Sequence, residues 1–169
     1  MSETLTQFGT SFQLKIIASL MSAIKFIQTI SDILQPEMFD SDSNKWLVKT
    51  IRDYYYEYKK QPTLEVIKYK IDEIDNDILK SGVIDKLREV WKNIEATDLE
   101  FVQSETLDFC KNQTLKNAIL ESVDMLENKN YDGIKSIIDE AMKAGTTRDL
   151  GHDYISSLET RLSESARIT

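Results

Sequence analysis

The segment FQLKIIASLMSAIKFIQTISDIL, residues 12–34, carries the strongest structural signal in the chain. Its apolar side chains recur at steps of three and four residues, which is the spacing of one face of an α-helix. The residues with this spacing are Ile16, Ile17, Leu20, Met21, Ile24, Ile27 and Ile33. Because the apolar face is broad, we expect one long helix or two short helices buried in a core.

The residues after this segment contain boundary signals for further helices. Pro36 is expected to end the buried segment, because proline and the residue before it disfavour helical backbone. Asp40 and Ser41 offer side-chain oxygens that can cap the next helix, and Thr63 can cap the helix after it. With one more apolar helix behind them, these elements predict a compact bundle of about five helices at residues 10–96.

A long helix with a short partner is predicted beyond this bundle. Asp98 can cap a helix that reaches about Glu127, and at 1.5 Å per residue that helix would be ~45 Å long, longer than a small bundle can cover. Asn128-Lys129-Asn130 is typical of a turn, and another helix is predicted at residues 131–143. We therefore expect residues 97–145 to form a projecting antiparallel helical hairpin.

Residues 146–169 are predicted to form a linker followed by a short helix. Gly145 is expected to end the hairpin, and Leu150 is the only apolar anchor in the linker that follows. Four apolar residues then have the spacing of one amphipathic face: Tyr154, Ile155, Leu158 and Leu162. Because no chain remains here for this face to pack on, we expect it to meet a partner surface or a further domain.

The composition of the chain is acidic and typical of helices. Its 21 lysines and arginines face 29 aspartates and glutamates, which gives a formal net charge of −8. This charge repels a phosphate backbone, so we do not expect the chain to bind DNA directly. Glycine and proline are scarce, at five and two, and no sustained strand-like alternation occurs. An all-α fold is therefore predicted.

The sequence also bears on the cellular compartment. Cys110 is the only cysteine, which excludes an internal disulfide and a zinc site built from several cysteines. The N-terminus lacks the basic segment of a signal peptide, and Lys15, Lys25 and Asp32 interrupt the apolar segment. We expect a cytoplasmic domain that is neither secreted nor membrane-spanning.

Residues that could carry catalysis are few. The single histidine, His152, lies in the predicted linker, where lone histidines are usually exposed to solvent. The carboxylates of residues 72–77 lack the spacing of a calcium-binding EF-hand loop, and no glycine-rich phosphate loop occurs. Tyr54, Tyr55 and Tyr56 could stack on bases, but their helical spacing favours packing in the core. We predict no catalytic, cofactor or metal site in these residues.

Four parts of the sequence carry a resemblance to a known family. They are Ile33-Leu34-Gln35-Pro36-Glu37-Met38-Phe39, the passage from Tyr58 to Leu64 around Gln61-Pro62-Thr63, the predicted hairpin, and Gly151-His152-Asp153-Tyr154 followed by Glu159 and Arg161. In this order the chain resembles the N-terminal domain of the DnaB-type replicative helicases, especially the phage branch that includes the T-even helicase. The resemblance extends from about Phe12 to Thr169.

The resemblance implies a ring-shaped hexamer in which N-terminal domains form a collar. In that family a RecA-like motor domain uses ATP and Mg²⁺ to unwind DNA, while primase and a helicase loader are the usual outside partners. No position here matches the catalytic residues of the motor, so the resemblance implies a non-catalytic domain that meets DNA only through the full-length ring. The sequence stops at Thr169, close to where the motor begins in the family, so we expect a piece of a longer protein.

The resemblance also assigns roles to two sets of apolar residues. The apolar faces of the hairpin helices are expected to hold the hairpin together and to leave surface for neighbouring subunits, in a dimer or a hexameric ring. These residues are Leu115, Ile119, Val123 and Leu126 on the first helix, and Ile134, Ile138, Ala141 and Met142 on the second. The apolar face of residues 154–162 is expected to dock on the motor domain of an adjacent subunit.

Two other classes of function remain open at the level of sequence. The first is a free-standing phage adaptor, helicase loader or inhibitor that acts by protein–protein contact, which a stop codon after Thr169 would indicate. The second is a helical metal-dependent hydrolase. That class needs several histidines paired with carboxylates, whereas this chain has one histidine.

Overall fold

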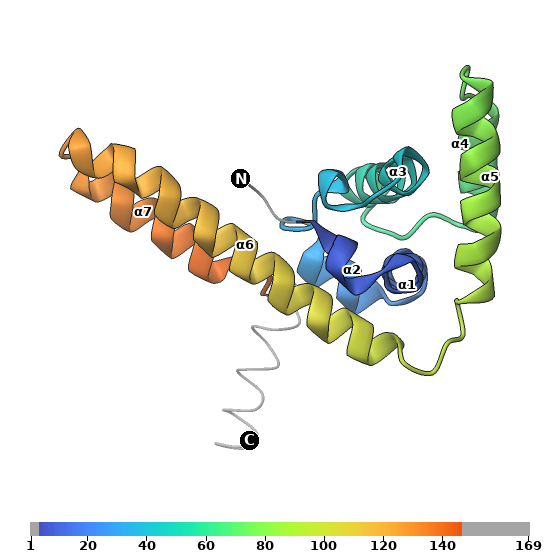
Figure 1. Cartoon of the computed structure of the whole chain (residues 1–169), viewed down its shortest axis with the longest axis horizontal. Helices are drawn as coiled ribbons and strands as arrows, with labels where there is room; N and C mark the ends of the chain where they lie inside the picture. Colours follow the sequence, from blue (N-terminus) through green and yellow to red (C-terminus); the bar gives the residue numbers. More distant parts are fainter. Residues whose placement is uncertain (1–3, 147–169) are drawn as a thin grey trace.

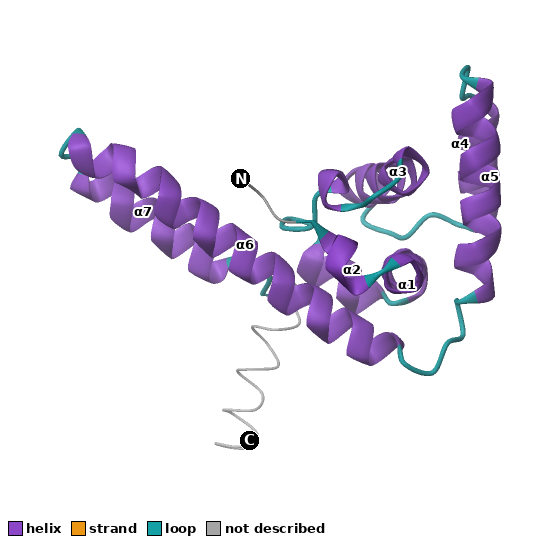
Figure 2. Cartoon of the chain, in the orientation of Figure 1, coloured by secondary structure: helices purple, strands orange, loops and turns teal. Residues whose placement is uncertain are grey.

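The computed structural model describes residues 4–146, and these residues confirm the predicted all-α fold. They contain helices and loops but no strand (Figures 1 and 2). The α-helices are α1 (Thr10–Ser22), α2 (Ile24–Ile30), α3 (Asp42–Tyr58), α4 (Leu64–Asp72), α5 (Asp77–Lys92), α6 (Leu99–Glu127) and α7 (Tyr131–Lys143). Two short 3₁₀ helices, η1 (Leu5–Phe8) and η2 (Pro36–Met38), accompany them.

The apolar opening segment forms two helices that meet at a sharp corner. Ala23 adopts an extended backbone (φ −115°, ψ 99°), which separates α1 from α2. Among residues 4–146 no single helix has both the length and the apolar content to cross a membrane. Only α1 and α2 taken together pass by length and composition, and they are bent by 107°.

Helix α1 forms the centre of the body. It contacts α3, α5 and α6, and Figure 1 shows it nearly end-on between them. The fully buried side chains on and around α1 include Ile16, Ile17, Ile27, Ile30, Leu47, Ile51 and Ile67. The broad apolar face of the opening segment is therefore covered from several directions, as its width predicts.

Side-chain caps define where several helices begin. The hydroxyls of Ser41 and Thr63 accept from backbone N–H groups three residues further on, at 3.1 and 3.2 Å, which confirms the two predicted caps. Asn76 and Asn130 cap α5 and α7 in the same way, at 3.0 Å each. Each such cap satisfies one backbone donor that the helix itself leaves free.

The predicted cap at Asp98 is wrong. Asp98 occupies the residue before α6 but makes no side-chain cap hydrogen bond. Its carboxylate instead accepts from the Lys15 ammonium on α1 at 2.8 Å. This hydrogen bond holds the pKa of Asp98 below its usual value, and it ties the start of α6 to the body.

Helix α6 belongs to both parts of the molecule. Val102, Phe109 and Cys110 of its first half lie in the same buried cluster as α1 and α3. The core therefore continues across the boundary predicted between residues 96 and 97. The second half of α6 extends away from the body with α7 alongside it, and the short turn between them makes the two helices antiparallel (Figure 1).

A candidate protein interaction surface

The contact between α6 and α7 is built on small side chains. Ala118 of α6 and Ala141 of α7 are the buried apolar residues of this pair, at 5% and 8% exposure. Around them lie half-buried side chains: Leu115, Ser122 and Met125 of α6, and Ile134, Ile137 and Ile138 of α7. The contact therefore combines two small, buried side chains with larger side chains that stay partly exposed.

Four residues expected to hold the hairpin together are largely exposed instead. Ile119, Val123 and Leu126 are 51%, 50% and 57% exposed, and Met142 is 65% exposed. This exposure corrects the expectation that these four side chains form the buried contact. Apolar residues cover more of the circumference of α6 than a single partner helix can bury, so part of the apolar band is left in solvent.

The opposite side of the hairpin faces the body. Asn117 and Glu121 of α6 and Ile137 and Glu140 of α7 line a single hollow of about 310 Å³, together with residues of the α2–α3 loop. These side chains mark the same edge of both helices. These residues therefore identify the side of α6 and the side of α7 that both face the body.

The exposed apolar residues of both helices lie on the other edge. At 100° per residue, Ile119, Val123 and Leu126 fall within about 60° of one another on α6, away from the hollow. The same geometry places Tyr131 and Met142 of α7, both more than 60% exposed, on that side of the hairpin. We call these five residues the hairpin face. All five side chains are at least 50% exposed, so no part of residues 4–146 buries them.

A depression lies beside the hairpin face and shares Ile119 with it. Asn112, Leu115, Lys116, Ile119 and Leu120 surround a shallow depression of about 250 Å³. Exposed apolar surface of this kind, on an element that projects from the body, is typical of contact sites for other proteins.

Two observations describe the cysteine, histidine and carboxylate side chains of residues 4–146. The Cys110 thiol is buried, and this burial raises its pKa to about 12, which keeps it protonated and unreactive. Among residues 4–146 no group of three or more histidine, cysteine, aspartate or glutamate side chains is placed to hold a metal ion.

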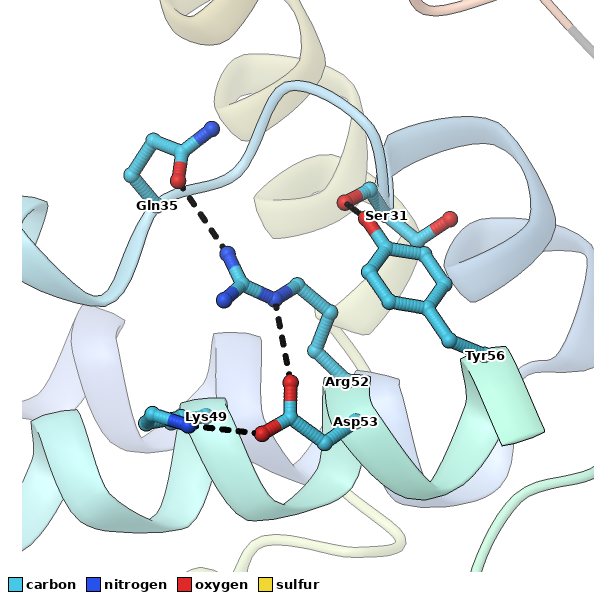
Figure 3. A network of polar contacts seen from close by, with 6 residues as sticks. All are labelled: Ser31, Gln35, Lys49, Arg52, Asp53 and Tyr56. Atoms are coloured by element: carbon cyan, nitrogen blue, oxygen red, sulfur yellow. Dashed lines mark hydrogen bonds and ion pairs between the residues drawn. The ribbon is translucent and has the colours of Figure 1, made fainter.

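Figure 3 shows a polar network that joins the α2–α3 loop to α3. The Arg52 guanidinium donates to Gln35 Oε1 at 3.1 Å and lies 3.8 Å from the Asp53 carboxylate. The Tyr56 hydroxyl donates to the Ser31 carbonyl at 2.5 Å, and burial raises the pKa of Tyr56. Arg52 also lies 5.8 Å from the centre of the Tyr56 ring. These contacts hold the α2–α3 loop against α3.

The tyrosine run packs less deeply than predicted. Tyr54 and Tyr55 are half-buried, and only Tyr55 packs against the main core. Tyr56 is 44% exposed although its hydroxyl is bound. The rings of Tyr54 and Tyr58 contact each other at the helix end, with their centres 4.5 Å apart and their planes tilted by 39°.

Several predicted residues lie outside the described part of the chain. The linker-helix residues Tyr154, Ile155, Leu158 and Leu162, and the lone histidine His152, all fall in residues 147–169. Their predicted roles therefore stay predictions.

No protein-family model matches this chain, and no match was found among the curated proteins or the solved structures compared with it.

Proposed function

We propose that this chain is an oligomerisation and partner-binding domain, the N-terminal collar of a hexameric DnaB-type replicative helicase. The observation that carries the proposal is the hairpin face, an apolar surface on a projecting pair of helices. The sequence similarities quoted above support the assignment to a helicase. In this proposal the domain has no catalytic site of its own, and ATP-driven DNA unwinding belongs to the motor domain.

The occupant of the hairpin face is a second copy of the chain. Covering a half-exposed isoleucine or leucine is worth about 1 kcal/mol, so several such side chains together can stabilise a specific contact. A projecting hairpin also brings two copies together without a clash between their bodies. Primase and a helicase loader are the proposed outside partners, DNA is met only through the full ring, and the proposed location is the cytoplasm.

The self-association is tested by sedimentation velocity over a range of chain concentrations. Ile119→Asp places a charge in the middle of the hairpin face and is expected to weaken association by about tenfold or more. Ile78→Asp is the matched control, because Ile78 is also exposed, at 86%, but belongs to α5, which lies at the other end of the molecule from the hairpin (Figure 1). A wild-type chain that stays monomeric, or equal effects of the two substitutions, would contradict the proposal.

The helicase assignment is tested by the reading frame beyond Thr169. Continuation into a strand followed by Gly-x-x-x-x-Gly-Lys-Ser/Thr, the signature of a phosphate-binding loop, would support it. A stop codon at that point would instead favour a free-standing adaptor, loader or inhibitor that uses the same surface.

A further inference from the structure

A second hollow lies at the opposite end of the molecule from the hairpin tip. Helices α4 and α5 stand side by side there (Figure 1), and a groove of about 650 Å³ lies between them. Its floor is apolar: Ile71 and Leu87 are buried, Leu64 and Ile84 are half-buried, and Trp91 is 47% exposed at the edge. An open apolar floor with a tryptophan at its edge has the composition of a binding hot spot.

The rim of this groove carries positive charge in an acidic chain. Lys68 of α4 and Arg88 and Lys92 of α5 line it, against a single carboxylate, Asp72. The chain as a whole has a net charge of −8. Cationic side chains therefore lie on both helices that form the groove. The groove is locally positive, whereas the chain as a whole is negative.

The neighbouring carboxylates leave these cations available. Arg88 lies 3.6 Å from Asp85, and Lys92 lies 3.2 Å from Glu89. The four side chains are between 50% and 72% exposed, and exposed pairs of this kind are weak and easily exchanged. Asp85 and Glu89 do not line the groove. A ligand in the groove therefore contacts the cations and not these two carboxylates.

The shape of the groove favours a helix as its occupant. The lining residues of α5 run from Ile84 to Lys92, a length of about 12 Å, which matches two turns of a helix. Amphipathic helices commonly bind in grooves of this kind through side chains spaced three and four residues apart.

From this geometry we infer that the α4–α5 groove binds an acidic amphipathic helix of another protein. Apolar side chains of that helix pack on Ile84 and Trp91, and its carboxylates pair with Lys68, Arg88 and Lys92. The net acidity of the chain and the apolar floor both disfavour a nucleic acid in this position. The inference does not rest on the hairpin face or on the helicase assignment.

The probe is a synthetic amphipathic peptide with leucine along one face and glutamate along its flanks. Fluorescein on the peptide reports binding to the unsubstituted chain by anisotropy. In a Trp46→Phe background, Trp91 is the only remaining tryptophan, so its emission reports contact at the groove. We expect saturable binding, a blue shift of Trp91 emission, and weaker binding as salt is raised. A sister peptide with lysine in place of each glutamate is expected not to bind.

Two matched double variants locate the site. Arg88→Glu with Lys92→Glu is expected to weaken binding of the acidic peptide by about tenfold or more. Lys116→Glu with Lys135→Glu, which changes the net charge equally but on the hairpin, is expected to leave affinity unchanged. All four positions are exposed, so circular dichroism melts should show folded variants.

Three outcomes would overturn the inference. The first is equal binding of the acidic and basic peptides, and the second is equal loss in the two double variants. The third is a concentration-dependent shift of Trp91 emission without peptide that Arg88→Glu with Lys92→Glu abolishes, because this result would make a second copy of the chain the occupant.

Discussion

At the level of single residues, Gln13 and Asp40 form the most connected polar contact of the body. Gln13 is fully buried; its amide nitrogen donates to the Asp40 carboxylate at 2.8 Å, and its amide oxygen accepts from the Asp40 backbone N–H at 3.0 Å. The Thr6 hydroxyl donates to the same carboxylate. Hydrogen bonds from Thr6 and then Gln13 lower the pKa of Asp40. These contacts connect η1, α1 and the loop before α3.

This arrangement predicts that part of the stability depends on ionised Asp40. Because its pKa is lower in the folded state, the stabilisation is present above the unfolded-state pKa and is lost as pH falls through the folded-state value. Asp40→Asn is therefore expected to lower the free energy of unfolding by less than about 1 kcal/mol near neutral pH, because solvent screens an exposed carboxylate. The difference should shrink in strong acid. Urea unfolding of both proteins at neutral and acid pH measures it, and a pH-independent difference would contradict the assignment.

A second prediction at the scale of single residues concerns the reactivity of the Cys110 thiol. It is fully buried, its sulfur lies 3.9 Å from the Met38 sulfur, and burial raises its pKa to about 12. A thiol reagent at mildly alkaline pH should therefore react only as fast as the protein opens, and at once in urea. Labelling followed by mass spectrometry measures both rates. Rapid labelling of the folded chain would show that α6 does not seal against the body.

At the level of elements, the pairing of α6 with α7 depends on which side chains are small. Ala118 and Ala141 lie in the contact, while Ile119 and Met142 beside them are exposed. Hydrophobicity alone would predict that Ile119 and Met142 are buried in preference to the alanines, because isoleucine and methionine gain more free energy from burial than alanine does. Position around the helix decides burial here, because Ile119 and Met142 point about 100° away from the neighbouring alanines that the contact buries.

A larger apolar side chain at the buried position 118 is therefore expected to destabilise the chain more than a smaller one at the exposed position 119. Ala118→Leu is expected to destabilise the chain by about 1–3 kcal/mol through overpacking, whereas Ile119→Ala, on the exposed face, should cost less than about 1 kcal/mol. Urea unfolding of the dilute, monomeric chain measures both. If Ile119→Ala proved the more damaging change, the larger apolar residues would form the contact after all.

At the level of the whole molecule, two apolar surfaces lie at opposite ends of the described chain (Figure 1). The hairpin face lies on α6 and α7, and the cationic groove lies between α4 and α5. Helix α1 contacts both α5 and α6, so the body joins the two ends through packed side chains. A domain built in this way can hold a copy of itself at one end and an acidic partner at the other.

This layout predicts that the two surfaces act independently. Ile119→Asp should leave the affinity for the acidic peptide unchanged within about twofold, because distant sites that share no partners are additive. Arg88→Glu with Lys92→Glu should likewise leave self-association unchanged. Anisotropy and sedimentation on the same set of variants measure both. Loss of peptide binding in Ile119→Asp would mean that the groove forms only in an assembled state.

The sequence predicted those parts of the structure that depend on interactions between residues close together in the chain. Helical spacing in residues 12–34 indicated a buried helical element, and the hydroxyls of Ser41 and Thr63 marked helix starts that the structure has. Each of these signals acts between residues at most four positions apart, so the local chain contains all the information. The same applies to the turn at residues 128–130.

The remaining features depend on residues that are distant in the chain. Asp98 failed as a cap because Lys15, 83 positions earlier, offers it a charged partner. The apolar band of α6 was visible in the sequence, but its buried side was chosen by α7 and the body. Trp91 is 47% exposed at a groove edge, and the packing of α4 against α5 sets that exposure. Helix formation is a local equilibrium, whereas burial depends on what packs against each face, and that is set only when the whole chain folds.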